Sequence, residues 1–252
     1  MNKEIALKNF LYRLADDHLI LGHRNSEWTG LGPLLEEDIA FSNMAQDKLG
    51  QSLALYEILQ TLGEKNPDTV AFTRNEAEYK CCHYVEYPIG EYDFSLIRHF
   101  LFDHAAYLRF EMLIQSSCEP LSKLAAKVRG EIKYHVMHAN IWIEKLGNGN
   151  EESHARLQSM INENFNLALG IFETCEDEEI LIAENIFAGE KLLQEKWIEA
   201  IEPILIKSNL KLPNPDQWQP VLGGRKGYHT VHLQPLLTEM QEVFAIDPDA
   251  EW

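Results

Sequence analysis

Apolar residues recur every three or four positions along most of the chain, which is the spacing of amphipathic α-helices. The pattern predicts long helices over residues 4–26, 35–62, 94–116 and 121–146. Shorter helices are expected near residues 76–85, 153–174, 186–207 and 233–244. Long alternating runs of β-branched residues, which would indicate strands, are missing from the sequence. The pattern therefore predicts an all-α fold, with residues 1–252 in one domain whose C-terminal extension begins at about residue 186.

The helix predicted over residues 35–62 has two polar residues in the middle of its apolar face, Lys48 and Gln51. A lysine is almost never fully buried without a partner. Four-helix diiron proteins place a Glu-x-x-His pair at this spacing, with both side chains projecting into the bundle. An ammonium group has no lone pair to offer a metal. We interpret this stretch as half of a former metal site, in which a side-chain cation replaces the metal ion.

Two other long helices also carry one polar residue on an apolar face, Asp103 and His135. Each alone has an ordinary explanation as a hydrogen-bonded core residue. A bundle brings the middles of its helices to one layer, so we expect these side chains to lie near Lys48. A neighbouring carboxylate would keep the buried ammonium charged, and Asp103 and Glu27 are the candidates.

The sequence contains one Glu-x-x-His motif, at Glu151 and His154, directly after the helix stop Gly147-Asn148-Gly149. The motif has no apolar flank. Acidic residues are favourable in the first turn of a helix. We therefore interpret this motif as a helix N-terminus and not as a metal site.

The overall charge excludes several classes of partner. The 40 acidic residues against 22 basic ones give a net charge of -18, which disfavours binding to nucleic acid and to anionic membranes. The four cysteines form no Cys-x-x-Cys motif, so we expect reduced thiols. No apolar run reaches the roughly 18 residues of a membrane span, and the N-terminus lacks the apolar core of a signal peptide. We expect a cytoplasmic protein.

Several segments of the chain together resemble one family. They are Ser26-Glu27-Trp28, residues 43–52, Ala71-Phe72-Thr73-Arg74, Leu146-Gly147-Asn148-Gly149, Gly223-Gly224-Arg225-Lys226-Gly227-Tyr228-His229-Thr230 and Leu237-Thr238-Glu239-Met240-Gln241. The chain is similar, almost end to end, to the non-catalytic subunits (PaaC) of bacterial ring-1,2-phenylacetyl-CoA epoxidase, which acts in phenylacetate degradation. The resemblance implies a ferritin-like four-helix bundle with additional C-terminal helices.

The resemblance also implies where a metal site would be. The catalytic subunits (PaaA) of this family hold a diiron site and epoxidise the aromatic ring of phenylacetyl-CoA. The matching positions here are Glu27, Lys48, Gln51, Asp103, Ile132 and His135. Glu27, Asp103 and His135 keep ligand-type side chains, whereas the other three do not. Three ligand-type side chains, with the ammonium of Lys48 among them, are not expected to hold two iron ions. We therefore expect a vacated site without metal or catalytic residues.

Three functions remain open at this point. The first is a structural subunit that stabilises the catalytic diiron subunit and joins further epoxidase subunits, including a reductase, with the iron held by the partner. A homo-oligomer is also compatible with the sequence. The second is an oxygenase in its own right, with one metal on Glu27, Asp103 and His135. The third is an acyl-CoA-binding module.

Two surface predictions accompany these functions. Acyl-CoA binding needs a basic patch, for which the candidates are Arg225, Lys226, Arg129 and Lys133. The structural role suggests a partner contact through Gly223, Gly224, Arg225, Lys226 and His229. The alternative for that segment is a glycine-rich turn in which Arg225 and Lys226 are solvated.

Overall fold

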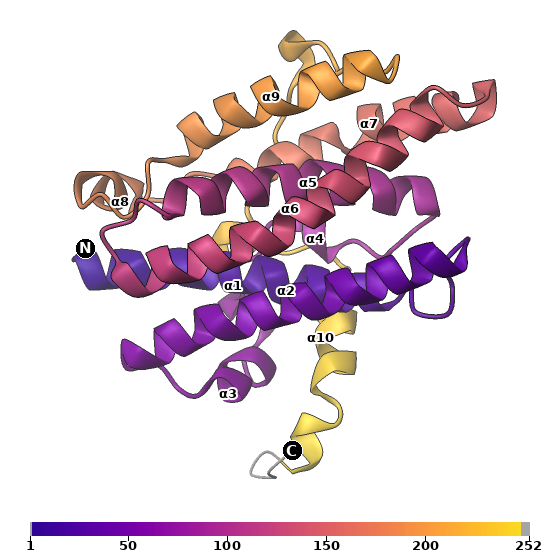
Figure 1. Ribbon diagram of the computed structural model, residues 1–252. Helices are drawn as coiled ribbons and strands as arrows, with labels where there is room; N and C mark the ends of the chain where they lie inside the picture. The colour runs from indigo at the N-terminus through magenta and orange to yellow at the C-terminus, as the bar shows by residue number, and fades with distance from the viewer. Residues whose placement is uncertain (1, 248–252) are drawn as a thin grey trace. The chain divides into compact units, whose positions relative to one another are not determined.

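The computed structural model describes residues 2–247, and all regular secondary structure in that range is helical (Figure 1). The predicted all-α, ferritin-like fold is confirmed. The chain divides into two compact units: unit 1 is Met1–Pro88 with Leu222–Trp252, and unit 2 is Ile89–Val221. None of the helices in residues 2–247 has both the length and the apolar character needed to cross a membrane.

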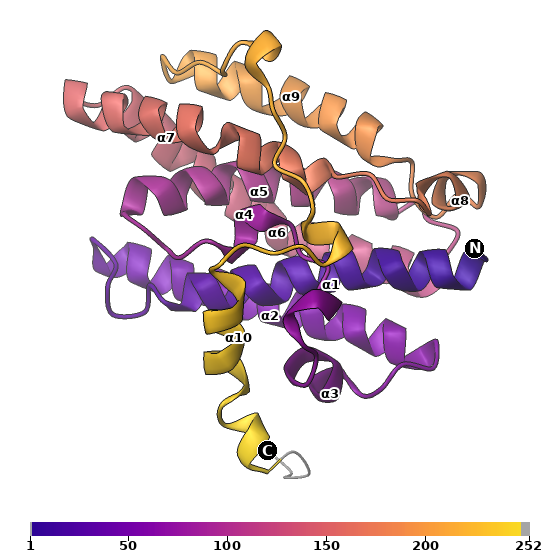
Figure 2. The same ribbon diagram turned by 180° about the vertical axis from the view of Figure 1, so that it is seen from behind.

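Unit 1 is built on two long helices, α1 (Lys3–Ser26) and α2 (Leu35–Thr61), which pack along each other. Gly22 of α1 permits this close approach, because a Cβ there would lie 3.0 Å from the side chain of Leu49. The short helices α3 (Pro67–Phe72) and α4 (His83–Glu86) follow. The unit is completed by α10 (Leu233–Gln241), and Figure 2 shows the chain before α10 passing across α1.

Unit 2 is organised around α5 (Tyr92–Leu113), which packs against α6 (Glu119–Gly147), α7 (Glu151–Leu169) and α9 (Glu190–Lys207). The short helix α8 (Glu178–Ala183) precedes α9. Trp197 of α9 is fully buried, stacks on Phe165 and donates its indole N–H to the carbonyl of Leu101 at 2.9 Å. Apolar burial and this buried hydrogen bond together fix α9 on the unit.

The long helices agree with the predicted ranges to within three residues at each end. The helix expected from residue 186 begins instead at Glu190, because Gly189 has φ of +103° and interrupts it. The helix expected near residues 76–85 is a 3₁₀ turn at Glu76–Glu78 and the separate α4. The expected C-terminal extension is shared between the units, since residues 186–221 belong to unit 2 and the rest to unit 1. The expected single domain stays a prediction.

Candidate functional site

The central polar residues of α2 lie on its core-facing side. Lys48 is fully buried, and Gln51, almost one turn further along, is 2% exposed. The buried apolar residues Met44 and Leu55 precede and follow them on the helix. Unit 1 thus has a fully buried lysine side chain and a buried carboxamide on the same helix.

Glu27 ends α1 and is engaged by an arginine. Its carboxylate accepts a hydrogen bond from Arg24 Nη1 at 2.6 Å, and its side chain is 32% exposed. The same guanidinium donates to the carbonyl oxygens of Glu86 and His232. Glu27 is therefore an ion-pair partner within a network that ties α1 to the last part of the chain.

In unit 2, α5 and α6 bring three of the predicted positions together. Asp103 and Ile132 are fully buried, and His135 is 4% exposed. His135 Nδ1 lies 3.9 Å from Asp103 Oδ1. Ile132 precedes His135 by three residues and therefore presents an apolar side chain at the carboxylate position of a Glu-x-x-His pair.

Two further histidines belong to this cluster and were not predicted from the sequence. His99 Nδ1 donates to Asp103 Oδ2 at 2.5 Å, and His138 Nδ1 lies 3.3 Å from His99 Nε2. Burial lowers the pKa of His99 to about 4, so its ring is neutral at pH 7. The spacing of the two histidines in the sequence could have indicated that they belong to this cluster. His99 is four residues before Asp103 and His138 is three residues after His135, and residues at these separations share one face of a helix.

The glycine-rich segment after Leu222 is directed into unit 1. Arg225 is buried and forms a two-pronged ion pair with Asp17 of α1, at 2.8 and 2.7 Å. Gly224 packs against the carbonyl of Cys81 so closely that a Cβ there would clash with it. The alternative in which Arg225 is solvated in a glycine-rich turn is therefore wrong, and Arg225 cannot belong to an exposed basic patch. Lys226 is exposed and remains available to a partner.

His229 of the same segment completes a second buried ion pair in unit 1. Its Nδ1 lies 2.8 Å from Glu86 Oε1, and its Nε2 lies 3.0 Å from the carbonyl oxygen of Tyr79. Both ring nitrogens of His229 therefore lie within hydrogen-bond distance of oxygen atoms inside the unit. The partner contact predicted for His229 would have to be made around a side chain that is already engaged inside the unit.

Cys81 lies beside this ion pair, and together they form a set of possible metal ligands. One ligand atom each from Cys81, Glu86 and His229 lies within 4.8 Å of the others. Burial, together with the nearby Glu86 carboxylate, raises the pKa of the Cys81 thiol well above its usual range. A metal would have to displace the thiol proton and break the contacts of His229 with Glu86 and with the carbonyl of Tyr79. We interpret the set as a buried hydrogen-bonded cluster with a neutral thiol.

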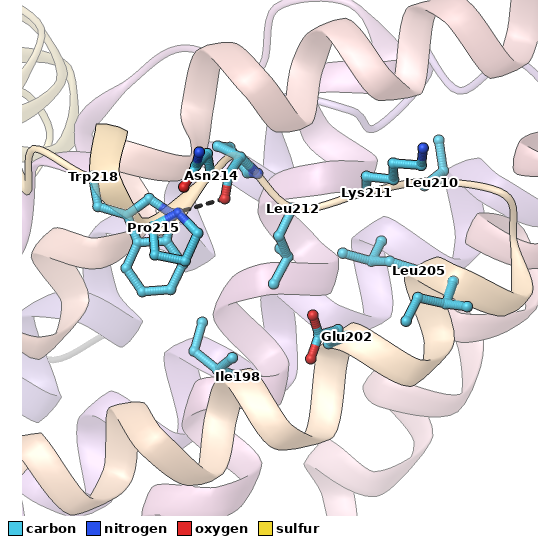
Figure 3. A pocket seen from close by; sticks show the side chains of 11 residues that line it. Ile198, Glu202, Leu205, Leu210, Lys211, Leu212, Asn214, Pro215 and Trp218 are labelled. Carbon is cyan, nitrogen blue, oxygen red and sulfur yellow. Dashed lines mark hydrogen bonds between the residues drawn. The ribbon is translucent and has the colours of Figure 1, made fainter.

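Unit 2 also has an open groove of about 570 Å³ between α9 and the segment that follows it (Figure 3). Apolar side chains form most of its wall, including Ile198, Leu205, Leu212, Pro215 and Trp218. The indole of Trp218 is held by a hydrogen bond to the carbonyl of Pro213 at 3.0 Å. Glu202 and Lys211 are the charged residues of the lining, and their charges cancel. The groove therefore offers no net positive charge to the phosphates of an acyl-CoA.

Comparison with known proteins places the chain in a family. The family model described as phenylacetic acid catabolic protein (PaaA_PaaC) matches residues 1–252. The chain belongs to this family. A relative is one of the subunits of the 1,2-phenylacetyl-CoA epoxidase from Escherichia coli (strain K12). That subunit is 32% identical to this chain over 247 residues, which make up 98% of this chain and 99% of the relative. The resemblance identified from the sequence is confirmed.

A diiron centre, which the resemblance implies for the catalytic members of this family, does not fit the side chains present here. Unit 1 has Lys48 and Gln51 at the positions where the resemblance implies a Glu-x-x-His pair. Unit 2 has the buried apolar side chain of Ile132 at a position where the resemblance implies a carboxylate. Of the two carboxylates that remain, Glu27 is paired with Arg24, and one oxygen of Asp103 is hydrogen-bonded to His99. Hard iron ions require several carboxylates and imidazoles, so this set has too few donors for two ions.

Proposed function

We propose that this chain is a structural, non-catalytic subunit of a cytoplasmic phenylacetyl-CoA epoxidase complex. In this role it binds and stabilises the catalytic diiron subunit and assembles with further subunits that include a reductase. Iron is held by the partner and not by this chain. The observation that supports the proposal best is the burial of Lys48 and Ile132 at positions where the resemblance places iron ligands.

The contacts within unit 2 are consistent with a fold that persists without metal. The buried carboxylate of Asp103 accepts a hydrogen bond from His99 at 2.5 Å, so a polar partner inside the unit satisfies it. Selection for assembly would preserve the helices and their surfaces without a need for oxygen activation.

The alternative of an independent oxygenase is weakened by the contacts of the retained ligand types. A three-residue metal site would need Glu27, Asp103 and His135 as ligands. Glu27 is already an ion-pair partner of Arg24, and Asp103 is hydrogen-bonded to His99. The acyl-CoA alternative is weakened in turn, because Arg225 is buried with Asp17.

Association with the catalytic subunit tests the proposal directly. The two chains are purified separately, mixed in equal amounts, and analysed by size-exclusion chromatography with light scattering. We expect a stable complex whose mass includes both chains, and a catalytic subunit that melts at a higher temperature in the mixture than alone. Two separate peaks at micromolar concentrations, with an unchanged melting temperature, would contradict the structural role.

A further inference from the structure

Two histidines in unit 2 that the sequence did not predict lie directly against each other. His99 belongs to α5 and His138 to α6, and their ring centroids are 5.4 Å apart. His99 Nε2 lies 3.3 Å from His138 Nδ1. Neither residue stands at a position where the resemblance implies an iron ligand. The pair is therefore not part of the vacated diiron set, and the proposed function gives it no role.

The distance between the two nitrogens fits a shared metal ion. A tetrahedral zinc ion holds imidazole nitrogens at about 2.0–2.1 Å, which places two of them about 3.3–3.4 Å from each other. The observed 3.3 Å between His99 and His138 matches that span. It is also longer than most N–H···O hydrogen bonds, which measure about 2.7–3.2 Å. A cation between the two rings therefore accounts for their separation at least as well as a shared proton does.

Asp103 orients one of the two nitrogens for this role. Its carboxylate accepts a hydrogen bond from His99 Nδ1 at 2.5 Å. With the proton on Nδ1, the lone pair of a neutral imidazole is on Nε2, which is the atom that faces His138. Histidines that bind metal ions are commonly held in this way, by a carboxylate on the nitrogen that does not bind the metal. Asp103 is fully buried, so this orientation is fixed inside the unit.

The pair forms an open site. His99 is 3% exposed and His138 is half-buried, so an ion can enter from the side of His138. Within residues 2–247, three ligand atoms from histidine, cysteine or carboxylate side chains come together only at Cys81, Glu86 and His229. The two histidines are thus the protein ligands of the site, and water fills the remaining positions. Such an ion is bound reversibly.

The donor atoms select the class of ion. Imidazole nitrogens suit zinc, copper and nickel, whereas magnesium and calcium prefer oxygen ligands. We propose that His99 and His138 bind one divalent ion of the zinc class, which joins α5 to α6 in unit 2. The inference goes beyond the proposed function and does not depend on it, because association with the catalytic subunit needs no metal in this chain. A single ion on two nitrogens is also distinct from a diiron centre.

Titration of the isolated chain with Zn²⁺ tests the site. The chain is freed of metal with a chelator, carries no histidine tag, and is titrated by calorimetry near neutral pH. We expect one zinc ion per chain and a higher melting temperature with zinc than without it. His138→Gln removes one ligand at a half-buried position and keeps a polar side chain, so we expect it to fold. It should bind zinc at least about tenfold more weakly and show no rise in melting temperature.

Two control variants identify where the zinc binds. His154→Gln removes the histidine of the Glu-x-x-His motif, whose Nε2 lies 2.9 Å from the carbonyl oxygen of Asn209, and Cys81→Ser removes a ligand type from unit 1. Both controls should bind zinc as the wild type does. Loss of zinc in Cys81→Ser with full binding in His138→Gln would place the ion in unit 1 and overturn the proposal.

Two other results would also overturn it. Equal affinity in the wild type and all three variants would indicate an adventitious ion only. A wild-type chain that binds no zinc would leave His99 and His138 as a hydrogen-bonded pair. Neither result bears on the proposed function, which is tested separately by association with the catalytic subunit.

Discussion

Replacing Arg225 with methionine should destabilise unit 1 strongly, although the residue lies in a segment with the composition of a surface turn. The guanidinium donates to Asp17 at 2.8 and 2.7 Å and to the carbonyl of Lys80 at 2.9 Å. Both side chains of the pair are at most 2% exposed. Methionine keeps much of the length of arginine, so the main effect is an uncompensated Asp17 carboxylate in the interior. Removing one partner of a buried pair costs about 3–5 kcal/mol.

The neighbouring residue provides a matched control for this prediction. Lys226 is exposed, and Lys226→Met removes the same charge from the same turn, with an expected cost below about 0.5 kcal/mol. The free energy of unfolding is measured by urea titration of the isolated chain. With a slope of about 2 kcal/mol per molar urea, Arg225→Met should lower the midpoint by roughly 1.5–2.5 M. If Arg225→Met and Lys226→Met unfold at the same urea concentration, the buried ion pair does not have the role assigned to it.

Two further changes test the roles of the buried polar residues. The triple variant Lys48→Glu, Gln51→His and Ile132→Glu restores all six ligand types. We expect elemental analysis to find iron in this variant and none in the wild type. A variant that folds but stays free of metal would show that the six positions do not share one layer. Burial lowers the pKa of His99 to about 4, against about 6.5 in the unfolded chain, so unfolding takes up a proton as the pH falls below 6.5. Stability should therefore fall by about 2 kcal/mol between pH 7 and pH 5, and His99→Gln should lack that part of the slope in paired urea titrations. An equal slope in His99→Gln would assign the pH dependence to other groups.

The sequence allowed the buried cation to be predicted because α2 has one clear apolar face. On such a helix a polar residue at a core-facing position stands out, and Lys48 did. The signal was incomplete on α5, where all residues from Ser95 to Ala106 are buried and the helix has no solvated face. Asp103 was recognised there as a polar residue on an apolar line, but His99, one turn before it, was not. On a stretch that is buried all round, periodicity does not separate every polar core residue from solvated ones.

The glycine-rich segment was misjudged for a different reason. Its Arg and Lys, set among glycines, have the composition of a solvated turn. The partner that buries Arg225 is Asp17, which is 208 residues away in the sequence. A local sequence pattern cannot indicate an ion pair between residues so far apart in the sequence. Only the folded chain showed that Arg225 is buried and Lys226 is exposed.

Metal content and oxygenase activity, measured on this chain alone and again after mixing with the catalytic subunit, test the central claim most directly. Iron is determined by elemental analysis, and activity by turnover of phenylacetyl-CoA with dioxygen and the reductase subunit. We predict no stoichiometric iron and no turnover for the chain alone, and turnover in the mixture with iron on the partner. Stoichiometric iron in the isolated chain, with oxygen-dependent turnover, would contradict a structural subunit in which Lys48 replaces the metal.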